Sequence, residues 1–215
     1  MNPWTLSRYD WLSLGLVGGT VLLGLLTYGQ LPETIPTHWN SQGVADGYSS
    51  KPVGTFMMPF IGLMTILVMK IVMVISPKGF RLDDSRRIVD LIQLILVALF
   101  CAIGVATLLA ALGFQFDMAK VVLIGTGLML AATGNIMSKV RKNFFVGIRT
   151  PWTLADDEVW AQTHRFAGRT FFVGGVFVCL VSLVYARIEV ILAGVGIAVL
   201  APVIYSYVIY RRLNP

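Results

Sequence analysis

The residues with the most evident capacity for chemistry lie in one polar segment, NFFVGIRTPWTLADDEVWAQTH, at residues 143–164. Asp156 and His164 could serve there as acid and base, and Arg149 could hold an anion. The sequence places no nucleophile and no metal-ligand cluster beside them. We therefore expect the segment to be a docked structural element or a protein-binding surface, and we expect the protein not to be an enzyme.

A second polar segment, LPETIPTHWNSQGVADGYSSKP at residues 31–52, is long for a connection between helices. His38 and Trp39 form an aromatic pair suited to a membrane interface, and Asn40 and Asp46 can hydrogen-bond turns locally. Prolines stiffen the segment and glycines supply its turns, at Pro32, Pro36, Pro52, Gly43 and Gly47. The segment is either an ordered lid over the helix ends or a recognition surface. His38 has no second ligand at metal spacing, so we expect no metal site.

The composition indicates what kind of molecule carries both segments. Of the 215 residues, 56% are hydrophobic and 13% are charged, and the mean hydropathy is +0.77, which predicts an integral membrane protein. The formal net charge of +6 indicates basic cytoplasmic loops rather than binding of nucleic acid. Cys101 and Cys179 lie within apolar runs, so we expect neither a disulfide nor a metal pair, and no cofactor is indicated.

Apolar stretches long enough to cross a hydrocarbon core about 30 Å thick predict an all-α, multi-pass fold. The six stretches are residues 11–28, 53–75, 88–112, 121–137, 170–186 and 190–210. The first follows one arginine, Arg8, and no evident small-residue cleavage site comes after it, so we expect a retained span rather than a signal peptide. The last two must form a tight helical hairpin around Arg187–Glu189.

Lysine and arginine predict the orientation of the bundle. With the N-terminus in the cytoplasm, 14 of the 17 basic residues lie inside and three lie outside, at Lys51, Lys120 and Arg187. The inside set is Arg8, Lys70, Lys78, Arg81, Arg86, Arg87, Lys139, Arg141, Lys142, Arg149, Arg165, Arg169, Arg211 and Arg212. This asymmetry predicts that both termini are cytoplasmic. The segment 31–52 then faces outside, and the segment 143–164 faces the cytoplasm.

Polar groups are few within the expected spans. We expect Lys70 and Asp90 to reach the inner interface, which leaves no acid or base in the middle of the membrane and disfavours a proton-driven transporter. The other interior polar residues are Gln93, Thr107, Thr126, Thr133, Asn135 and Ser182. Small residues predict close helix packing, within one chain or between two, at Gly15, Gly19, Ala98, Ala102, Ala106 and Ala110.

A short amphipathic helix is predicted over residues 154–164, lying in the membrane interface before the fifth span. Thr153 and Asp156 resemble a capping box at its start. Asp156, Trp160 and His164 fall on one face of this helix at spacings of four residues.

The outer IPTHWNSQGVADGYSSKP and the inner NFFVGIRTPWTLADDEVWAQTHRFAG resemble the two signatures of the SdpI-type bacterial immunity family. The first is similar to a small N-terminal domain of unknown function that accompanies the family, and the second is similar to the family's own block. The resemblance covers most of the chain. We divide the chain into an N-terminal half, residues 1–115, with spans one to three, and an SdpI-like C-terminal half, residues 116–215, with spans four to six.

The resemblance implies a protein of the bacterial inner membrane that protects its host from a secreted, sporulation-delay-type toxin peptide. It also implies a signalling receptor that holds a transcriptional repressor at the membrane once the toxin is bound. The outer ligand site would then comprise His38, Trp39, Asn40, Asp46 and Lys51. The cytoplasmic motif would comprise Asn143, Gly147, Arg149, Thr150, Pro151, Trp152, Trp160 and His164. The alternative is a small transporter or flippase for an amphipathic peptide or lipid, whose flux would depend on Gln93 or Asn135.

Overall fold

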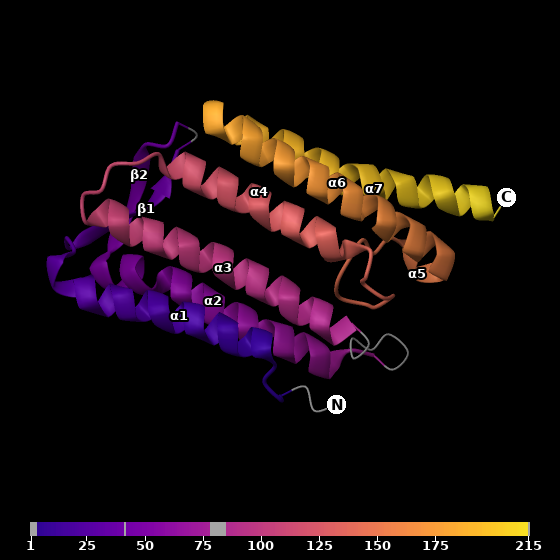
Figure 1. Ribbon diagram of the computed structural model, residues 1–215, viewed down its shortest axis with the longest axis horizontal. Helices are drawn as coiled ribbons and strands as arrows, with labels where there is room; N and C mark the ends of the chain where they lie inside the picture. The colour runs from indigo at the N-terminus through magenta and orange to yellow at the C-terminus, as the bar shows by residue number, and fades with distance from the viewer. Residues whose placement is uncertain (1–3, 41, 78–84, 215) are drawn as a thin grey trace.

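The computed structural model describes residues 4–40, 42–77 and 85–214, which are mainly helical (Figure 1). This part of the chain holds six helices that are long and apolar enough to cross a membrane. They are α1 (Arg8–Thr27), α2 (Lys51–Ile75), α3 (Arg86–Ala111), α4 (Met118–Met137), α6 (Asp157–Val184) and α7 (Ile188–Leu213). The predicted all-α, multi-pass membrane fold is confirmed. The cytoplasmic placement of both termini stays a prediction, and Lys78 and Arg81 of the predicted inside set lie outside the described residues.

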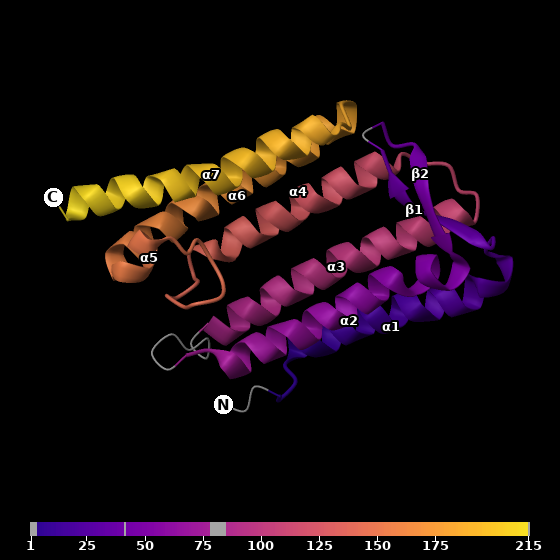
Figure 2. The same ribbon diagram turned by 180° about the vertical axis from the view of Figure 1, so that it is seen from behind.

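The long helices run side by side in two groups of three, which Figures 1 and 2 show from opposite sides. In the first group α3 packs against α1 and α2, and in the second α6 packs against α4 and α7. The groups meet mainly where α3 contacts α4, and the chain passes between them at residues 112–117. The division into separate domains 1–115 and 116–215 stays a prediction.

The contact between α4 and α6 depends on glycine. A Cβ added to Gly134 would lie 2.5 Å from the backbone N of Phe172 and 2.7 Å from the carbonyl O of Gly168. One added to Gly127 would lie 2.8 Å from the carbonyl O of Gly175. The two backbones therefore touch along the helices, as small residues allow in membrane proteins.

The small-residue contacts predicted for the first group are wrong, as contacts within the chain, for Gly15, Gly19, Ala98 and Ala102, whereas Ala106 is buried as predicted. A Cβ added to Gly15 or Gly19 would meet nothing within 4 Å. On α3, Ala98 and Ala102 are exposed, and the buried face includes Val97, Cys101, Gly104 and Leu108.

A two-stranded antiparallel hairpin, β1 (Thr34–Trp39) and β2 (Ala45–Ser50), occupies the connection between α1 and α2 after a short 3-10 turn, Tyr28–Gln30. Its anchor is Ile35, which is fully buried and packs with Leu31 and Leu108. A Cβ on Gly54 would lie 2.5 Å from the Cβ of Ile35, so α2 also needs a glycine at this contact. The hairpin is thereby fixed over one end of α2 and α3 (Figure 2).

The predicted interfacial helix over 154–164 is wrong in its boundaries. A separate short helix, α5 (Pro151–Ala155), ends before Asp156, which is extended and whose carboxylate accepts hydrogen bonds from the N–H groups of Glu158 and Val159. α6 begins at this N-cap and runs without a break through the fifth span. The capping box is also shifted, since it pairs Thr150 with Thr153 rather than Thr153 with Asp156.

Candidate functional site

The β1–β2 hairpin, which we predict to lie on the outer side, places three of the five predicted ligand residues on one cleft. His38, Trp39 and Asn40 edge an apolar cleft of about 430 Å³ that lies between the hairpin and the helices. Its walls come from both helix groups, with Met58 and Ile103 from the first and Met118, Leu123, Ile188 and Ile191 from the second. A few polar groups at the rim of a mostly apolar cleft are the usual features of a ligand site.

Asp46 and Lys51 lie outside this cleft. Asp46 supports it indirectly, because its Oδ1 lies 2.5 Å from the Nδ1 of His38 and fixes the imidazole ring. Lys51 starts α2, where its Nζ lies 3.6 Å from Glu33 Oε1 and 4.9 Å from the centre of the Tyr28 ring. Three of the five predicted residues therefore line the cleft, Asp46 supports one of them, and Lys51 belongs to a separate ion pair.

Asn40 also has a structural role in the hairpin turn. Its side-chain oxygen accepts hydrogen bonds from the N–H groups of Gln42 and Val44, at 2.9 and 3.0 Å. Gly43 has a φ of +79°, a conformation that glycine adopts without strain. The local turn predicted for Asn40 is thus present, and it sets the shape of the cleft rim.

The cytoplasmic motif folds against the start of α6 through its buried residues. The amide of Asn143 donates to the carbonyls of Arg141 and Val146 and accepts from the N–H groups of Phe145 and Val146, so it holds the loop in a closed turn. Thr150 lies 3.0 Å from the hydroxyl of Ser206, which joins the loop to α7.

His164, on α6, holds the same loop in place. Its Nε2 accepts the N–H of Ile148 at 3.1 Å, and its Nδ1 donates to the carbonyl of Trp160 at 2.9 Å. The ring stacks on Trp160 at 4.0 Å, whose own Nε1 donates to the carbonyl of Val140. Gly147, with a φ of +119°, packs directly against the imidazole. Both ring nitrogens are occupied, so His164 is placed to hold the loop and not to exchange protons.

The remaining motif residues face outward or pack at the edge. Arg149 is exposed and donates to the carbonyl of Phe144 at 2.6 Å, and Pro151 is exposed at the start of α5. Trp152 packs on Tyr207 with ring centres 5.0 Å apart. The three residues considered for chemistry therefore have separate structural roles. Asp156 caps α6, Arg149 contacts the loop backbone, and the buried His164 holds the loop against α6.

The N-cap role of Asp156 has an electrostatic consequence. Hydrogen bonds from Val159 and Glu158, together with the nearby Lys142 and the amide of Asn214, hold the pKa of this carboxyl below its usual value. The start of α6 therefore favours the ionised carboxylate, as expected for an acid at a helix N-terminus.

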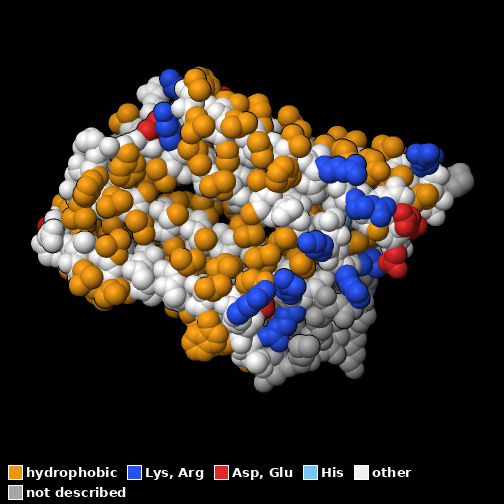
Figure 3. Space-filling view, viewed as in Figure 1, with side chains coloured by type: hydrophobic (Ala, Val, Ile, Leu, Met, Phe, Trp, Pro, Cys, Tyr) orange, Lys and Arg blue, Asp and Glu red, His pale blue; other side chains and the backbone are white. Residues whose placement is uncertain are grey.

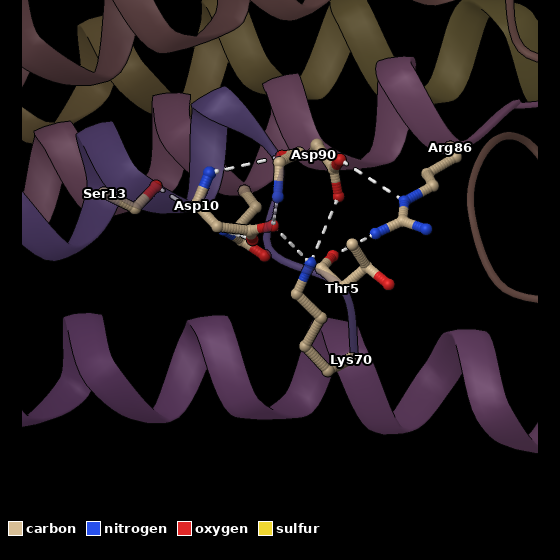
Figure 4. A network of polar contacts seen from close by, with 8 residues as sticks. Thr5, Asp10, Ser13, Lys70, Arg86 and Asp90 are labelled. Carbon is tan, nitrogen blue, oxygen red and sulfur yellow. Dashed lines mark hydrogen bonds and ion pairs between the residues drawn. The ribbon is translucent and has the colours of Figure 1, made fainter. Parts of the chain in front are cut away.

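A network of buried charges joins α1, α2 and α3, and it contradicts the expectation that Lys70 and Asp90 reach the interface (Figure 4). Lys70 Nζ lies 2.6 Å from Asp10 Oδ2 and 3.7 Å from Asp90 Oδ1. Asp10, Lys70 and Asp90 are only 0%, 4% and 2% exposed. Arg86 completes the charge balance, at 3.8 Å from Asp90, and it also donates to the carbonyl of Thr5.

Gln93 links this network to the helix interior. Its Nε2 donates to Asp10 Oδ1 at 3.0 Å and approaches Ser13 Oγ at 3.4 Å, whereas its Oε1 has no hydrogen-bond partner among the described residues. Asp10 was missed from the sequence because it precedes the first apolar stretch. The available signal was that Asp10, Lys70 and Asp90 all lie at the same end of their predicted helices. Buried ionic groups of this kind in a membrane bundle are paired and expensive to disrupt.

Within the described residues, no group of three or more His, Cys, Asp or Glu side chains is placed to hold a metal ion.

Comparisons with known proteins match both polar segments. Residues 139–206 match the SdpI/YfhL protein family, and residues 15–63 match a domain of unknown function, DUF1648. The immunity protein SdpI of Bacillus subtilis (strain 168) is 28% identical over 205 residues, which cover 94% of this chain and 96% of that protein. No solved structure matches the chain. The resemblance to SdpI-type proteins is confirmed, and neither the family description nor the relative's name states an enzymatic activity.

Proposed function

From this similarity to the SdpI/YfhL family, we propose that the protein is a membrane immunity protein that protects its host by binding a secreted toxin peptide at its outer side. The observation that carries the proposal is the similarity to an immunity protein along nearly the whole of both chains. The match includes the outer hairpin within residues 15–63 and the cytoplasmic loop within residues 139–206.

The outer cleft suits part of an amphipathic peptide. A peptide that kills cells by acting at a membrane needs apolar side chains, and Ile103, Met118 and Ile191 offer them an apolar wall. His38 and Asn40 at the rim can hydrogen-bond a peptide backbone that remains in the interface. Binding in the cleft would keep the peptide away from the lipid, and this is protection without catalysis.

Survival of a toxin-sensitive bacterium tests the proposal. Cells that express the wild type should survive challenge with purified sporulation-delay-type peptide, and cells that express the triple variant His38→Ala, Trp39→Ala, Asn40→Ala at equal membrane level should not. Because Asn40 also shapes the turn, a second variant, Ile191→Trp, fills the cleft from α7 and leaves the hairpin intact.

The matched control for the cleft variant is Leu192→Trp on the next residue of α7, where the side chain is 65% exposed. Protection should be lost with Ile191→Trp and kept with Leu192→Trp. Full protection by both tryptophan variants would refute the cleft as the toxin site, and a wild type that gives no protection would refute immunity to this peptide.

The second part of the proposal concerns signalling. The buried residues of the cytoplasmic motif fix the loop, which leaves Phe144, Arg149 and Pro151 exposed on its surface. We propose this surface as the docking site for a transcriptional repressor. Arg149→Glu should abolish recruitment of a co-expressed repressor to the membrane fraction and leave survival unchanged. Unchanged recruitment would show that this surface is not the docking site.

The competing function is transport of an amphipathic peptide or lipid, favoured by the position of the cleft between two helix groups. Gln93 lies in the buried charge network and Asn135 lies on a different groove, so neither lines the cleft. Flux in proteoliposomes that Ile191→Trp abolishes would support transport through the cleft. Protection without flux would support immunity by binding.

A further inference from the structure

A groove on the lipid-facing side of the second helix group has no part in the proposed function. It lies where α4 and α6 touch at Gly134 and Gly168, and its volume is about 380 Å³. The two glycines lie at its floor, where the backbones of the two helices touch. Figure 3 shows Lys and Arg side chains gathered on this end of the molecule, whereas the other end carries few of them.

The polar end of the groove is positively charged. Arg165 and Arg169 lie one turn apart on α6, and Asn135 and Ser138 face them from α4. Among the described residues, Arg169, Asn135 and Ser138 make no hydrogen bond or ion pair with other side chains, and Arg165 has only a long, exposed contact of 3.5 Å with Glu158. Two guanidinium groups with an amide and a hydroxyl match the oxygens of a phosphate group.

The groove becomes apolar in the direction of the hairpin end. Phe172 continues the Arg165–Arg169 side of α6, and Val176 follows seven residues after Arg169 on the same face. On α4, Leu128 lies seven residues before Asn135 and is 60% exposed. A ligand with a charged head and a long apolar tail fits this order of side chains, whereas a free anion uses only the polar end.

The depth of the groove agrees with a lipid headgroup. Arg169 directly precedes the apolar run 170–186, and Ser138 directly follows the run 121–137. Both residues therefore lie at the boundary of the hydrocarbon core, where lipid phosphates are found.

We propose that this groove binds one anionic phospholipid, with its phosphate between Arg165 and Arg169 and an acyl chain along Phe172, Val176 and Leu128. The lipid would fill the seam between α4 and α6 and fix the second helix group in its leaflet. The residues that line the site are different from those of the proposed toxin cleft and from Phe144, Arg149 and Pro151 of the proposed repressor surface.

Native mass spectrometry of the full-length protein in a neutral detergent tests the proposal, with phosphatidylglycerol and phosphatidylcholine as the probes. The wild type should bind one phosphatidylglycerol in preference to phosphatidylcholine. Each arginine near an anionic headgroup contributes about fivefold, so Arg165→Gln with Arg169→Gln should weaken phosphatidylglycerol binding by about ten- to thirtyfold. The matched control is Arg211→Gln with Arg212→Gln, which removes the same charge from the end of α7.

The variant Phe172→Ser distinguishes binding of a lipid from binding of free phosphate, because it keeps both arginines and removes the apolar contact. Weaker phosphatidylglycerol binding by Phe172→Ser, together with no effect of millimolar inorganic phosphate, supports the lipid. Equal competition by inorganic phosphate would overturn it in favour of a simple anion site. Equal losses in the two double-arginine variants, or equal binding of the two lipids, would show general charge attraction and overturn the site.

Discussion

Replacing Lys70 by methionine should destabilise the first helix group by about 3–5 kcal/mol, the usual cost of breaking a buried ion pair. The magnitude follows from what remains in the site. Asp10 would keep the Ser7 N–H at 2.7 Å and the Gln93 amide at 3.0 Å but would lose its cation, which lies 2.6 Å away. Asp90 would keep Arg86 at 3.8 Å. One buried carboxylate is thus left without a charge partner.

A double variant separates this electrostatic cost from lost packing. Asp10→Asn removes the orphaned charge, and its single side-chain oxygen can still accept from one of the two donors, the Ser7 N–H or the Gln93 amide. In the Lys70→Met background it should recover about 0.5–3 kcal/mol, the range seen for residues in one network. The control is Lys139→Met, at an exposed position, which should change stability by about 0.5 kcal/mol or less.

The assay is equilibrium unfolding of the detergent-solubilised protein by a denaturing detergent, followed through tryptophan fluorescence. The expected order of stability is wild type and Lys139→Met together, then the double variant, then Lys70→Met. If Lys70→Met unfolds at the same denaturant level as Lys139→Met, the charges are hydrated in the native state and the reasoning fails. If the double variant is less stable than Lys70→Met, Asp10 does not carry the cost.

Three further predictions concern the second helix group. Gly134→Leu should separate α4 from α6, because even a Cβ there would lie 2.5 Å from Phe172 N. The variant should have a lowered melting temperature, and an unchanged melting temperature would contradict the close contact. His164→Phe should leave the N–H of Ile148 without an acceptor and make the loop 143–150 sensitive to protease, whereas equal cleavage rates would contradict the pinning role. Asp156→Ala should lower stability near neutral pH and have less effect in acid. The pKa of Asp156 is lower in the folded protein than in the unfolded one. Its contribution to stability is therefore present above the unfolded pKa and is lost as the pH falls through the folded pKa. A stability difference between wild type and variant that does not depend on pH would contradict this.

Hydropathy was sufficient to predict the six spans, because length and apolarity alone decide whether a helix can cross a membrane. The pairing of charges was not predictable in this way. Asp10 and Lys70 are 60 residues apart in sequence, and their contact exists only because α1 and α2 pack side by side. The expectation that Lys70 reaches the interface considered one helix, whereas the structure offers it two carboxylates from neighbouring helices.

The polar segments show the same limit at the level of single residues. Proline, glycine and asparagine disfavour strands, so the hairpin could not be predicted from local preference, and the burial of Ile35 against α2 and α3 fixes it. By residue type His164 could serve as an acid or base, although no partner for catalysis stands beside it in the sequence. Its role depends on two backbone groups, the Ile148 N–H and the Trp160 carbonyl, whose positions no side-chain pattern encodes.

The two proposed ligands differ in which parts of the bundle they touch, and this gives them different consequences. The outer cleft has walls from both helix groups, so an occupant there contacts α2 and α3 as well as α4 and α7. Because this occupant bridges the two groups, it can favour one placement of the second group relative to the first. The cytoplasmic motif would follow the second group, since His164 and Ser206 fix the motif to it. A ligand shifts such an equilibrium only by its difference in affinity for the two placements.

The phospholipid in the α4–α6 groove contacts the second group alone, so it should stabilise that group without changing how it sits against the first. We therefore propose that any signal passed from one side of the membrane to the other starts in the cleft and not in the groove.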